Sequence, residues 1–380
     1  MRISLLSTHD IGGGAHVAAH RIHAAFLKNG HQSQQCVAIK SSDDRYVKGP
    51  DSKSKLGWAL IRPLFNNLPL YFYRHRTKEK LSLALLPSDT VPRALAFKPD
   101  IVNLHWIADG FLRIPDPVRF ARPIVWTLHD MWPFTGGCHY DQECNRFREA
   151  CGQCPLLGSK NRNDLTRKTL RQKQSIYRRL NLQVVAPSRW MAQCAQASTA
   201  FKDVPVHTIP YPIDLERFKP RDKAAMRELL GLPQDKKLIL FSAINSTHND
   251  RKGFFLLNEA LQTPAMLQHV GAMECVILGA PPQQPLADLQ FKLHFIGHLH
   301  DQVSLAAVYA AVDLFVAPSL QDNLPNTVIE SLACGTPAAA FDIGGMPDMI
   351  KHKQNGYLAS PMDADNLAEG ILWSLESKDR

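Results

Sequence analysis

Short apolar runs recur along the chain, separated by longer stretches in which apolar residues return every three or four positions. The runs are 3–7, 35–39, 101–106, 124–128, 183–186, 238–243, 275–279, 293–297, 313–317 and 337–341. Runs of this length with little polar alternation are typical of strands buried on both faces of a parallel sheet. Between the first two, Ala18, Ile22 and Phe26 fall on one face of a helix that ends near Lys28. The pattern predicts an α/β fold built from Rossmann-like units.

Length and charge divide the chain into two halves. A chain of 380 residues favours two domains. Residues 1–210 contain 30 Lys and Arg against 15 Asp and Glu, whereas residues 211–380 contain 14 against 20. We therefore expect one domain in each range, with an anionic partner for the first. No run of about 20 apolar residues and no signal-peptide pattern is present, which predicts a cytoplasmic protein.

The most informative stretch covers residues 313–345. It predicts a buried strand, a polar loop, a helix over 324–334 and a second strand over 337–341. Such a unit places its loop and helix N-terminus at the carboxyl edge of a parallel sheet, where open α/β folds bind ligands. Asp322 lies in the loop and Glu330 eight residues later, so a carboxylate is available for ribose hydroxyls and free amides for phosphate. The alternative is an ordinary βα unit with a surface Asp and Glu.

This stretch resembles a known family. D-x7-E followed by SLACGTPAAAFDIGG is similar to the E-x7-E motif of retaining glycosyltransferase family 4, with Asp in place of the first Glu. The resemblance covers nearly the whole chain, including the interdomain pattern I-P-x-x-I-D-x-x-x-F-x-P over 209–220. It implies a GT-B fold of two Rossmann-like domains facing a cleft, with the last helix returning to the first domain. It also implies transfer of a hexosyl group from a nucleotide-diphosphate donor, with retention, to a saccharide or lipid-linked saccharide in cell-surface polysaccharide biosynthesis.

The resemblance also implies roles for single residues. Lys252 corresponds to the family's diphosphate-binding lysine, with Arg251 as a substitute for an arginine that normally stands where this chain has Asn245. Glu330 would bind the ribose, and Asp322 and His129 would orient the donor sugar. The remaining donor-binding candidates are Gly13, Gly14, Asn323, Leu324, Asn326 and Thr327. A solvated loop lysine and a structural histidine are the alternatives for Lys252 and His129. His105 also ends an apolar run. No catalytic cofactor or divalent ion is expected.

Four of the eight cysteines fall in an insertion over 131–155. Cys138, Cys144, Cys151 and Cys154 follow the pattern C-x5-C-x6-C-x2-C. The tight C-x2-C pair suits tetrahedral zinc, and disulfides are rare in the cytoplasm. We expect a structural Zn²⁺, with free thiols or a redox pair as alternatives and His139 as a spare ligand.

Two basic segments have open interpretations. Residues 52–80 mix Lys and Arg with Trp, Phe, Tyr and Leu, a composition typical of an interfacial membrane segment. Residues 160–180 hold eight Lys and Arg and one Asp. Either segment fits peripheral contact with anionic lipid at the inner face of the membrane, and either fits a helix with a solvated charged side. Nucleic acid is disfavoured because no known binding module is recognisable. The rival functions are another nucleotide-sugar enzyme, such as a phosphorylase or epimerase, and a non-catalytic binding protein.

Overall fold

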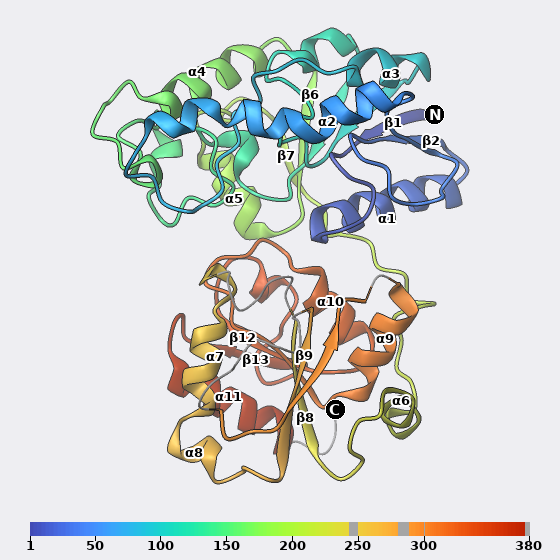
Figure 1. Ribbon diagram of the computed structural model, residues 1–380, viewed down its shortest axis with the longest axis vertical. Coiled ribbons are helices and arrows are strands. Elements are labelled where there is room, and N and C mark those ends of the chain that lie inside the picture. The colour runs from blue at the N-terminus through green and yellow to red at the C-terminus, as the bar shows by residue number, and fades with distance from the viewer. Residues whose placement is uncertain (243–249, 280–288, 300, 377–380) are drawn as a thin grey trace. The chain divides into compact units, whose positions relative to one another are not determined.

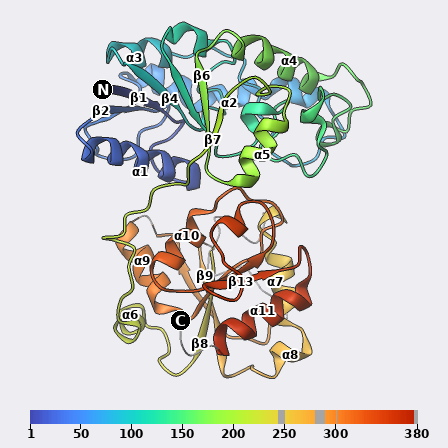
Figure 2. The same cartoon turned by 180° about the vertical axis from the view of Figure 1, so that it is seen from behind.

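The computed structural model describes residues 1–242, 250–279, 289–299 and 301–376. The chain divides into two compact units, Met1–Pro212 and Ile213–Arg380. Each unit is built on one parallel sheet with helices packed against it (Figures 1 and 2). The predicted α/β class is confirmed.

The first unit contains seven parallel strands in the order β3-β2-β1-β4-β5-β6-β7. They are β1 (Arg2–Leu6), β2 (Gln32–Cys36), β3 (Val47–Lys48), β4 (Ile101–Leu104), β5 (Ile124–Thr127), β6 (Leu182–Ala186) and β7 (Val206–Thr208). The helices are α1 (Gly14–Lys28), α2 (Lys53–Asn66), α3 (Thr90–Ala96), α4 (Leu165–Tyr177) and α5 (Arg189–Ala197). In Figure 1 α2 crosses the front of this unit, and in Figure 2 it lies behind the strands.

The second unit contains six parallel strands in the order β10-β9-β8-β11-β12-β13. They are β8 (Lys237–Ser242), β9 (Met273–Leu278), β10 (Leu293–Gly297), β11 (Leu314–Ala317), β12 (Ala338–Phe341) and β13 (Gly356–Ala359). The helices are α6 (Lys223–Leu230), α7 (Phe254–Leu261), α8 (Pro264–Leu267), α9 (Gln302–Ala311), α10 (Asn326–Ala333) and α11 (Ala364–Glu376).

The second sheet has a separate core on each face because side chains alternate along its strands. Ile239 and Phe241 of β8 pack in the core that includes α7, α8 and α11. Leu238 and Leu240 pack in the core that includes α9 and α10. Burial on both faces explains why these strands appear in the sequence as continuous apolar runs.

The second strand of the chain begins earlier than the apolar pattern predicts. It covers Gln32–Cys36 and not 35–39, and its polar side chains are mostly buried. Ser33 Oγ and His23 Nδ1 of α1 lie 2.7 Å apart in a hydrogen bond. Gln35 Oε1 and His20 Nδ1 form a second one over 3.1 Å. Because polar pairs pack this strand against α1, an apolar run could not locate it.

The last helix packs within its own unit, and the expectation that it also returns to the first domain stays a prediction. The structure places α11 in the second unit, where it packs on β12, β13 and α7. Leu367, Ile371 and Leu375 are buried in that core. These apolar side chains at helical spacing hold the helix on its own sheet.

In both sheets the strand order reverses beside the first strand of the unit. β2 and β4 lie on either side of β1, and β9 and β11 lie on either side of β8. Open parallel sheets bind ligands at the carboxyl ends of their strands, at this switch point. The loops that follow β1, β4 and β5, and those that follow β8 and β11, are therefore the places to look for a site.

Candidate functional site

In the second unit, two loops bring cationic and acidic side chains together at the switch point. Arg251 and Lys252 lie in a 3-10 turn (Asp250–Lys252) between β8 and α7, and Asp322 lies in the loop between β11 and α10. Lys252 Nζ donates to Asp322 Oδ2 over 2.6 Å. Arg251 Nη1 lies 3.6 Å from the same oxygen. The structure thus joins three predicted site residues, while Asn245 lies outside the described residues.

Glycines allow the backbone to close tightly around Asp322. Gly253 has a φ of +66°, and a Cβ there would lie 1.8 Å from the carbonyl oxygen of Pro318. A Cβ on Gly344 would lie 1.9 Å from the carbonyl oxygen of Asp322 itself. No side chain fits at either contact, so these two glycines fix the loops that carry the ion pair.

Helix α10 holds the other donor-site candidates of this unit. It begins at Asn326, two residues later than predicted, because Pro325 is extended with ψ 123°. Glu330 is only 5% exposed and Asp322 only 7% exposed, which contradicts the alternative of a surface Asp and Glu. Asn323, Leu324 and Asn326 are buried, and Thr327 is half-buried.

The ion pair sets the charge of this site. Burial acts to raise the pKa of Asp322, but the cations Lys252 and Arg251 outweigh it and lower the pKa to about 2. Asp322 is therefore ionised at any ordinary pH. One carboxylate faces two cations, so the cluster carries surplus positive charge, which suits a diphosphate.

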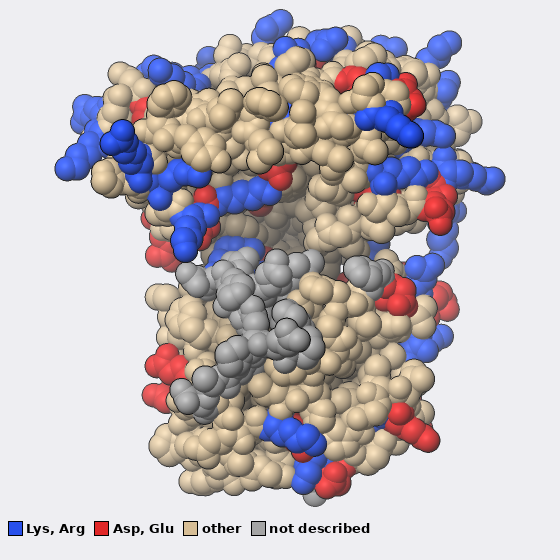
Figure 3. Space-filling view, viewed as in Figure 1, with Lys and Arg blue, Asp and Glu red and all other residues tan. Residues whose placement is uncertain are grey.

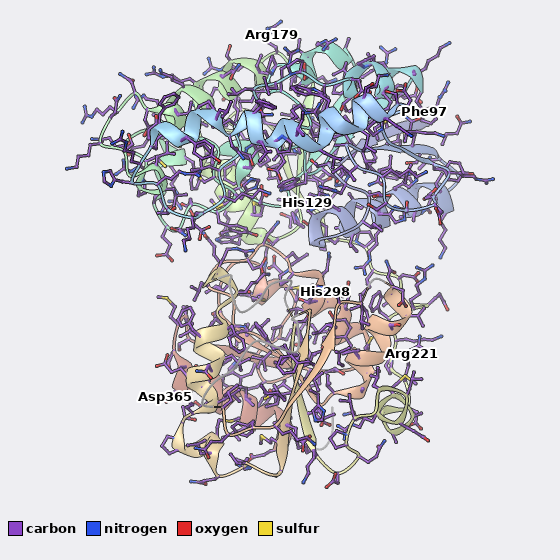
Figure 4. All side chains as sticks on the ribbon, in the orientation of Figure 1. Phe97, His129, Arg179, Arg221, His298 and Asp365 are labelled. Carbon is purple, nitrogen blue, oxygen red and sulfur yellow. The ribbon has the colours of Figure 1, made fainter. Side chains whose placement is uncertain are left out.

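In the first unit, a chain of hydrogen bonds links residues that follow β4 and β5. His105 Nε2 lies 2.9 Å from Asn103 Oδ1, and His105 Nδ1 lies 2.9 Å from His129 Nε2. His129 Nδ1 lies 2.7 Å from the Tyr211 hydroxyl, whose ring stacks on the imidazole with centroids 5.3 Å apart. Figure 4 labels His129 at the edge of this unit beside one end of α1. Its two ring nitrogens are thus both engaged.

The direction of these hydrogen bonds follows from Asn103. Its Nδ2 donates to the carbonyl oxygen of Val125, so its Oδ1 accepts from His105 Nε2. Burial lowers the pKa of His105 well below its ordinary value and that of His129 to about 4, so both rings are neutral near pH 7. His105 Nδ1 then accepts from His129 Nε2, and His129 Nδ1 accepts from Tyr211. The hydrogen-bond chain of the first unit is therefore neutral, whereas the cluster of the second unit is charged.

Further side chains join this strand edge and were not predicted from the sequence. Asp130 Oδ2 accepts from Trp106 Nε1 over 2.7 Å and pairs with His139 Nδ1 over 2.6 Å. His16 Nδ1 lies 2.9 Å from Ser7 Oγ, and burial lowers the pKa of His16 to about 3. The sequence could have indicated a role for Ser7, Trp106 and Asp130, because each lies at the end of a predicted strand or closely after it. Tyr211 and His16 had no such signal.

The glycine turn after β1 lies at the start of α1. Gly13 is the N-cap of α1 with a φ of +105°, a conformation that side chains rarely adopt, and Gly14 is the first helical residue. The backbone amides of His16 and Val17 bond back to the Gly13 carbonyl oxygen. The turn is therefore a structural start of the helix, and the donor-binding role of its glycines stays a prediction.

The cysteine-rich insertion is irregular but ordered by internal contacts. All four cysteines are free thiols, with Cys138 and Cys154 buried and the other two half-buried. His139, the spare ligand candidate, has both ring nitrogens engaged, because Nε2 bonds to Ser82 Oγ over 2.8 Å and Nδ1 bonds to Asp130. His139 is therefore bonded to Asp130 and Ser82 and not to the cysteines.

Two family models match the chain. The model described as Glycosyltransferase Family 4 matches residues 12–217, which is more than half of the chain. The chain belongs to glycosyltransferase family 4. The model described as Glycosyl transferases group 1 matches residues 236–377 of the same family 4 chain.

Curated relatives of this family 4 chain carry glycosyltransferase names. The putative teichuronic acid biosynthesis glycosyltransferase TuaC of Bacillus subtilis is 32% identical over 330 residues, covering 85% of this chain and 72% of that protein. D-inositol 3-phosphate glycosyltransferase 2 of Catenulispora acidiphila is 28% identical over 194 residues, covering 46% of this chain. The chain spans only 43% of that relative's length.

Solved structures share the fold of this family 4 chain. HepE of Anabaena, solved in complex with UDP-glucose, is similar with a TM-score of 0.63 at 17% identity. The similarity covers 99% of this chain and 90% of that chain. Together with the two parallel sheets it confirms the GT-B prediction.

Proposed function

We propose that this protein transfers a hexosyl group from a nucleotide-diphosphate donor to a saccharide or lipid-linked saccharide. The transfer retains anomeric configuration and serves cell-surface polysaccharide biosynthesis. The observation that carries the proposal is the Lys252–Asp322 pair with Arg251 at the switch point of the second unit. Two cations beside one fixed carboxylate form a site for a leaving diphosphate, whose charge grows as the glycosidic bond breaks.

The proposed reaction assigns each group a task. The Lys252 ammonium has three donors, so it can keep Asp322 and also bind a phosphoryl oxygen. Glu330, buried on α10, would accept from the ribose hydroxyls. Asp322 would accept from a hydroxyl group of the donor sugar. His129 would orient that sugar if its Nδ1 exchanges the Tyr211 hydroxyl for a sugar hydroxyl. Retention follows if the acceptor hydroxyl attacks the face from which the diphosphate leaves, and no protein nucleophile is needed.

The relatives support the donor and the pathway. The similar structure of HepE holds UDP-glucose, and TuaC is named for teichuronic acid biosynthesis. A UDP-linked hexose is therefore the first donor to test. A thermal-shift screen of UDP-, GDP-, ADP- and CDP-sugars should raise the melting temperature with one nucleotide class, and Glu330→Ala should abolish the shift. Equal shifts in the two proteins would contradict the assigned ribose contact.

Product analysis separates the proposal from its rivals. Proton NMR of a product made from an α-linked donor should show an α-linkage, which tests retention. Release of a sugar phosphate in the presence of inorganic phosphate would instead identify a phosphorylase. A changed donor without a new glycosidic bond would identify an epimerase. Absence of binding to all four nucleotide classes would favour the non-catalytic alternative.

We also propose that α2 and the 3-10 turn after it (Leu68–Phe72) contact an anionic membrane that carries the acceptor. Nine large apolar or aromatic side chains are exposed to solvent there: Leu56, Trp58, Leu60, Ile61, Leu64, Phe65, Leu68, Tyr71 and Phe72. Figure 3, viewed as in Figure 1, shows this side of the first unit as largely uncharged, with Lys and Arg gathered toward its margins. In the described residues no helix combines the length and apolarity required to span a membrane. Such a surface suits interfacial binding.

Vesicle co-sedimentation tests this contact. The protein should bind vesicles containing phosphatidylglycerol more than vesicles of phosphatidylcholine alone, and Leu64→Glu with Phe72→Glu should remove the binding. Leu229→Glu is the matched control, since Leu229 is equally exposed on α6 of the second unit. Unchanged binding by the double variant would contradict the proposed surface.

A further inference from the structure

The four cysteines of the insertion line one small cavity. Its volume is about 10 Å³, and its walls include the residues Cys138, Cys144, Cys151 and Cys154. A space of this size holds one water-sized particle. Residues separated by up to 16 positions in the chain thus surround a space that fits a single ion.

Backbone amides already point at three of the sulfurs. Burial raises the pKa of these three thiols, and the backbone amides near them partly oppose that effect: Arg146 at Cys144, Gly136 at Cys151, and Leu156 and Leu157 at Cys154. Amide donors of this kind stabilise a thiolate, the form in which cysteine binds a metal. The turn that carries the last pair is tight, with positive φ at Cys151, Gly152 and Gln153.

A buried lysine lies beside the cysteines, and burial lowers its pKa to about 7. Lys173 of α4 is fully buried, and its Nζ donates to the carbonyl oxygens of Trp132 and Thr135. The groups that act on it electrostatically are Cys138, Cys151 and Asp130. No carboxylate forms an ion pair with Lys173 among the described residues. A buried ammonium normally requires an anionic partner.

The insertion contributes Trp132, Phe134 and Phe147 to the main core of the first unit, but it has little regular secondary structure. From the end of β5 to the start of α4, residues 128–164 contain only three short 3-10 turns. The small apolar cluster beneath them has seven buried members, of which two are Cys138 and Cys154. Irregular segments of this length are uncommon in compact domains.

We propose that these four cysteines bind a structural Zn²⁺. Four thiolates around Zn²⁺ carry a net charge of −2, which would add to the opposing charge of Asp130 that already acts on Lys173. The thiol protons leave on binding, and the backbone amides near three of the sulfurs would stabilise the thiolates. With four sulfurs bound the ion keeps no open position, so its role is to fix the insertion and not to catalyse.

The thiols must move to bind the ion. As the side chains stand, no three His, Cys, Asp or Glu residues in the described part of the chain are spaced to hold a metal. Rotation of the four side chains toward their shared cavity would close the site. Disulfides would use the same cysteines but would add no charge near Lys173, so the two explanations predict different measurements.

Metal analysis of the full chain, purified without chelators, tests the proposal. Mass spectrometry of the metal should find about one zinc per chain. Exchange for Co²⁺ should give the intense visible bands of a tetrahedral thiolate site. Cys144→Ser and Cys151→Ser should lower zinc content at least tenfold, whereas Cys194→Ser, a buried cysteine on α5, should leave it unchanged.

Lys173→Met tests the counter-charge with a side chain of similar length. Zinc should transfer to a competing chelator about tenfold faster from this variant, with its circular dichroism spectrum unchanged. Wild-type protein that lacks zinc and shows no Co²⁺ bands after reconstitution under reducing conditions would overturn the proposal. Fewer than eight titratable thiols in zinc-free, denatured protein would assign the cluster to disulfides instead.

Discussion

The two units reverse their strand order at the same place but build opposite chemistry there. At the switch point of the second unit, Lys252 and Arg251 face Asp322 as charged partners. At the carboxyl edge of the first unit, His105, His129 and Tyr211 form a neutral chain with one direction of donation. Similar sheets thus carry a charged cluster in one unit and an uncharged hydrogen-bond chain in the other.

The two sites differ in charge because burial dominates at His129, whereas two cations outweigh its effect on Asp322. Burial lowers the pKa of His129 to about 4, and the weak opposing effect of Asp130 does not restore its charge. Asp322 is equally buried, but two cations lower its pKa to about 2 and keep it ionised. Charged groups suit a phosphate leaving group, and neutral ones suit sugar hydroxyls. The comparison predicts that changes in the two units will affect different steps.

The largest expected effect comes from Lys252→Ala. Removing one preorganised cation from the leaving group should lower kcat/KM by about 10²–10³-fold and weaken UDP binding. Steady-state kinetics with the donor found by thermal shift would measure this. Lys351→Ala, an exposed lysine of the same unit, is the matched control. Full activity of Lys252→Ala would contradict the proposal that the Lys252, Arg251 and Asp322 cluster stabilises the leaving diphosphate.

A different pattern is expected for His129→Ala. The donor sugar would lose its orientation, so kcat/KM should fall by up to about 10²-fold. Affinity for UDP should stay within about twofold of wild type, because the variant leaves the second unit intact. Isothermal titration calorimetry with UDP, beside the kinetics, separates the two effects. A parallel loss of UDP affinity would contradict the division of tasks between the units.

The two units should respond to acid in different pH ranges. His129 and His16 have folded pKa values of about 4 and 3 against 6.5, so the unfolded chain binds more protons and stability falls as pH drops below 6.5. The Asp322 pKa is about 2 against 3.8, so its contribution, about 2 kcal/mol, persists above pH 3.8 and is lost only below it.

Hydrogen exchange measured by mass spectrometry follows each unit separately. Peptides of the first unit should lose protection between pH 6.5 and 4, while peptides around Asp322 keep theirs. His129→Asn should flatten the response of the first unit, and Asp322→Asn should leave it unchanged. Simultaneous loss of protection in both units at one pH would show that the histidines do not control the first unit's stability.

The smallest effect is expected for Tyr211→Phe. The variant removes one hydroxyl from the hydrogen-bond chain and keeps the ring that stacks on His129. The free energy of unfolding should fall by about 1 kcal/mol in urea titrations. His129 Nδ1 would then lack this donor, so its pKa measured by NMR should also change. Reduced stability with an unchanged His129 pKa would show that the hydroxyl donates instead to the carbonyl oxygen of Leu128, 3.2 Å away.

Much of the fold could be predicted from the apolar runs. Strands such as β11 and β12 are buried on both faces, so continuous apolar sequence marks them within one or two residues. The meeting of Lys252 and Asp322 was implicit as well, since each follows a strand and β8 pairs with β11. The direct ion pair between Lys252 and Asp322 could not be predicted from the sequence, because it depends on the turn geometry that Gly253 and Gly344 allow.

Other features depend on contacts that no local pattern encodes. Tyr211 reaches His129 across 82 residues, a meeting fixed by the pairing of β5, β6 and β7. Lys173 stands in a run of basic residues typical of a solvated helix, yet tertiary packing buries it on α4. The polar strand β2 was misplaced for a related reason, because its neighbours satisfy its Ser and Gln side chains.

Calorimetric titration of UDP into wild-type protein, Lys252→Ala and His129→Ala tests the central comparison most directly. The account predicts saturable binding to the wild type and to His129→Ala, with at least tenfold weaker binding to Lys252→Ala. Increasing salt should weaken the wild-type affinity, as expected for charge-assisted contacts. Equal UDP affinity in all three proteins would contradict the claim that the charged switch point of the second unit holds the donor's diphosphate.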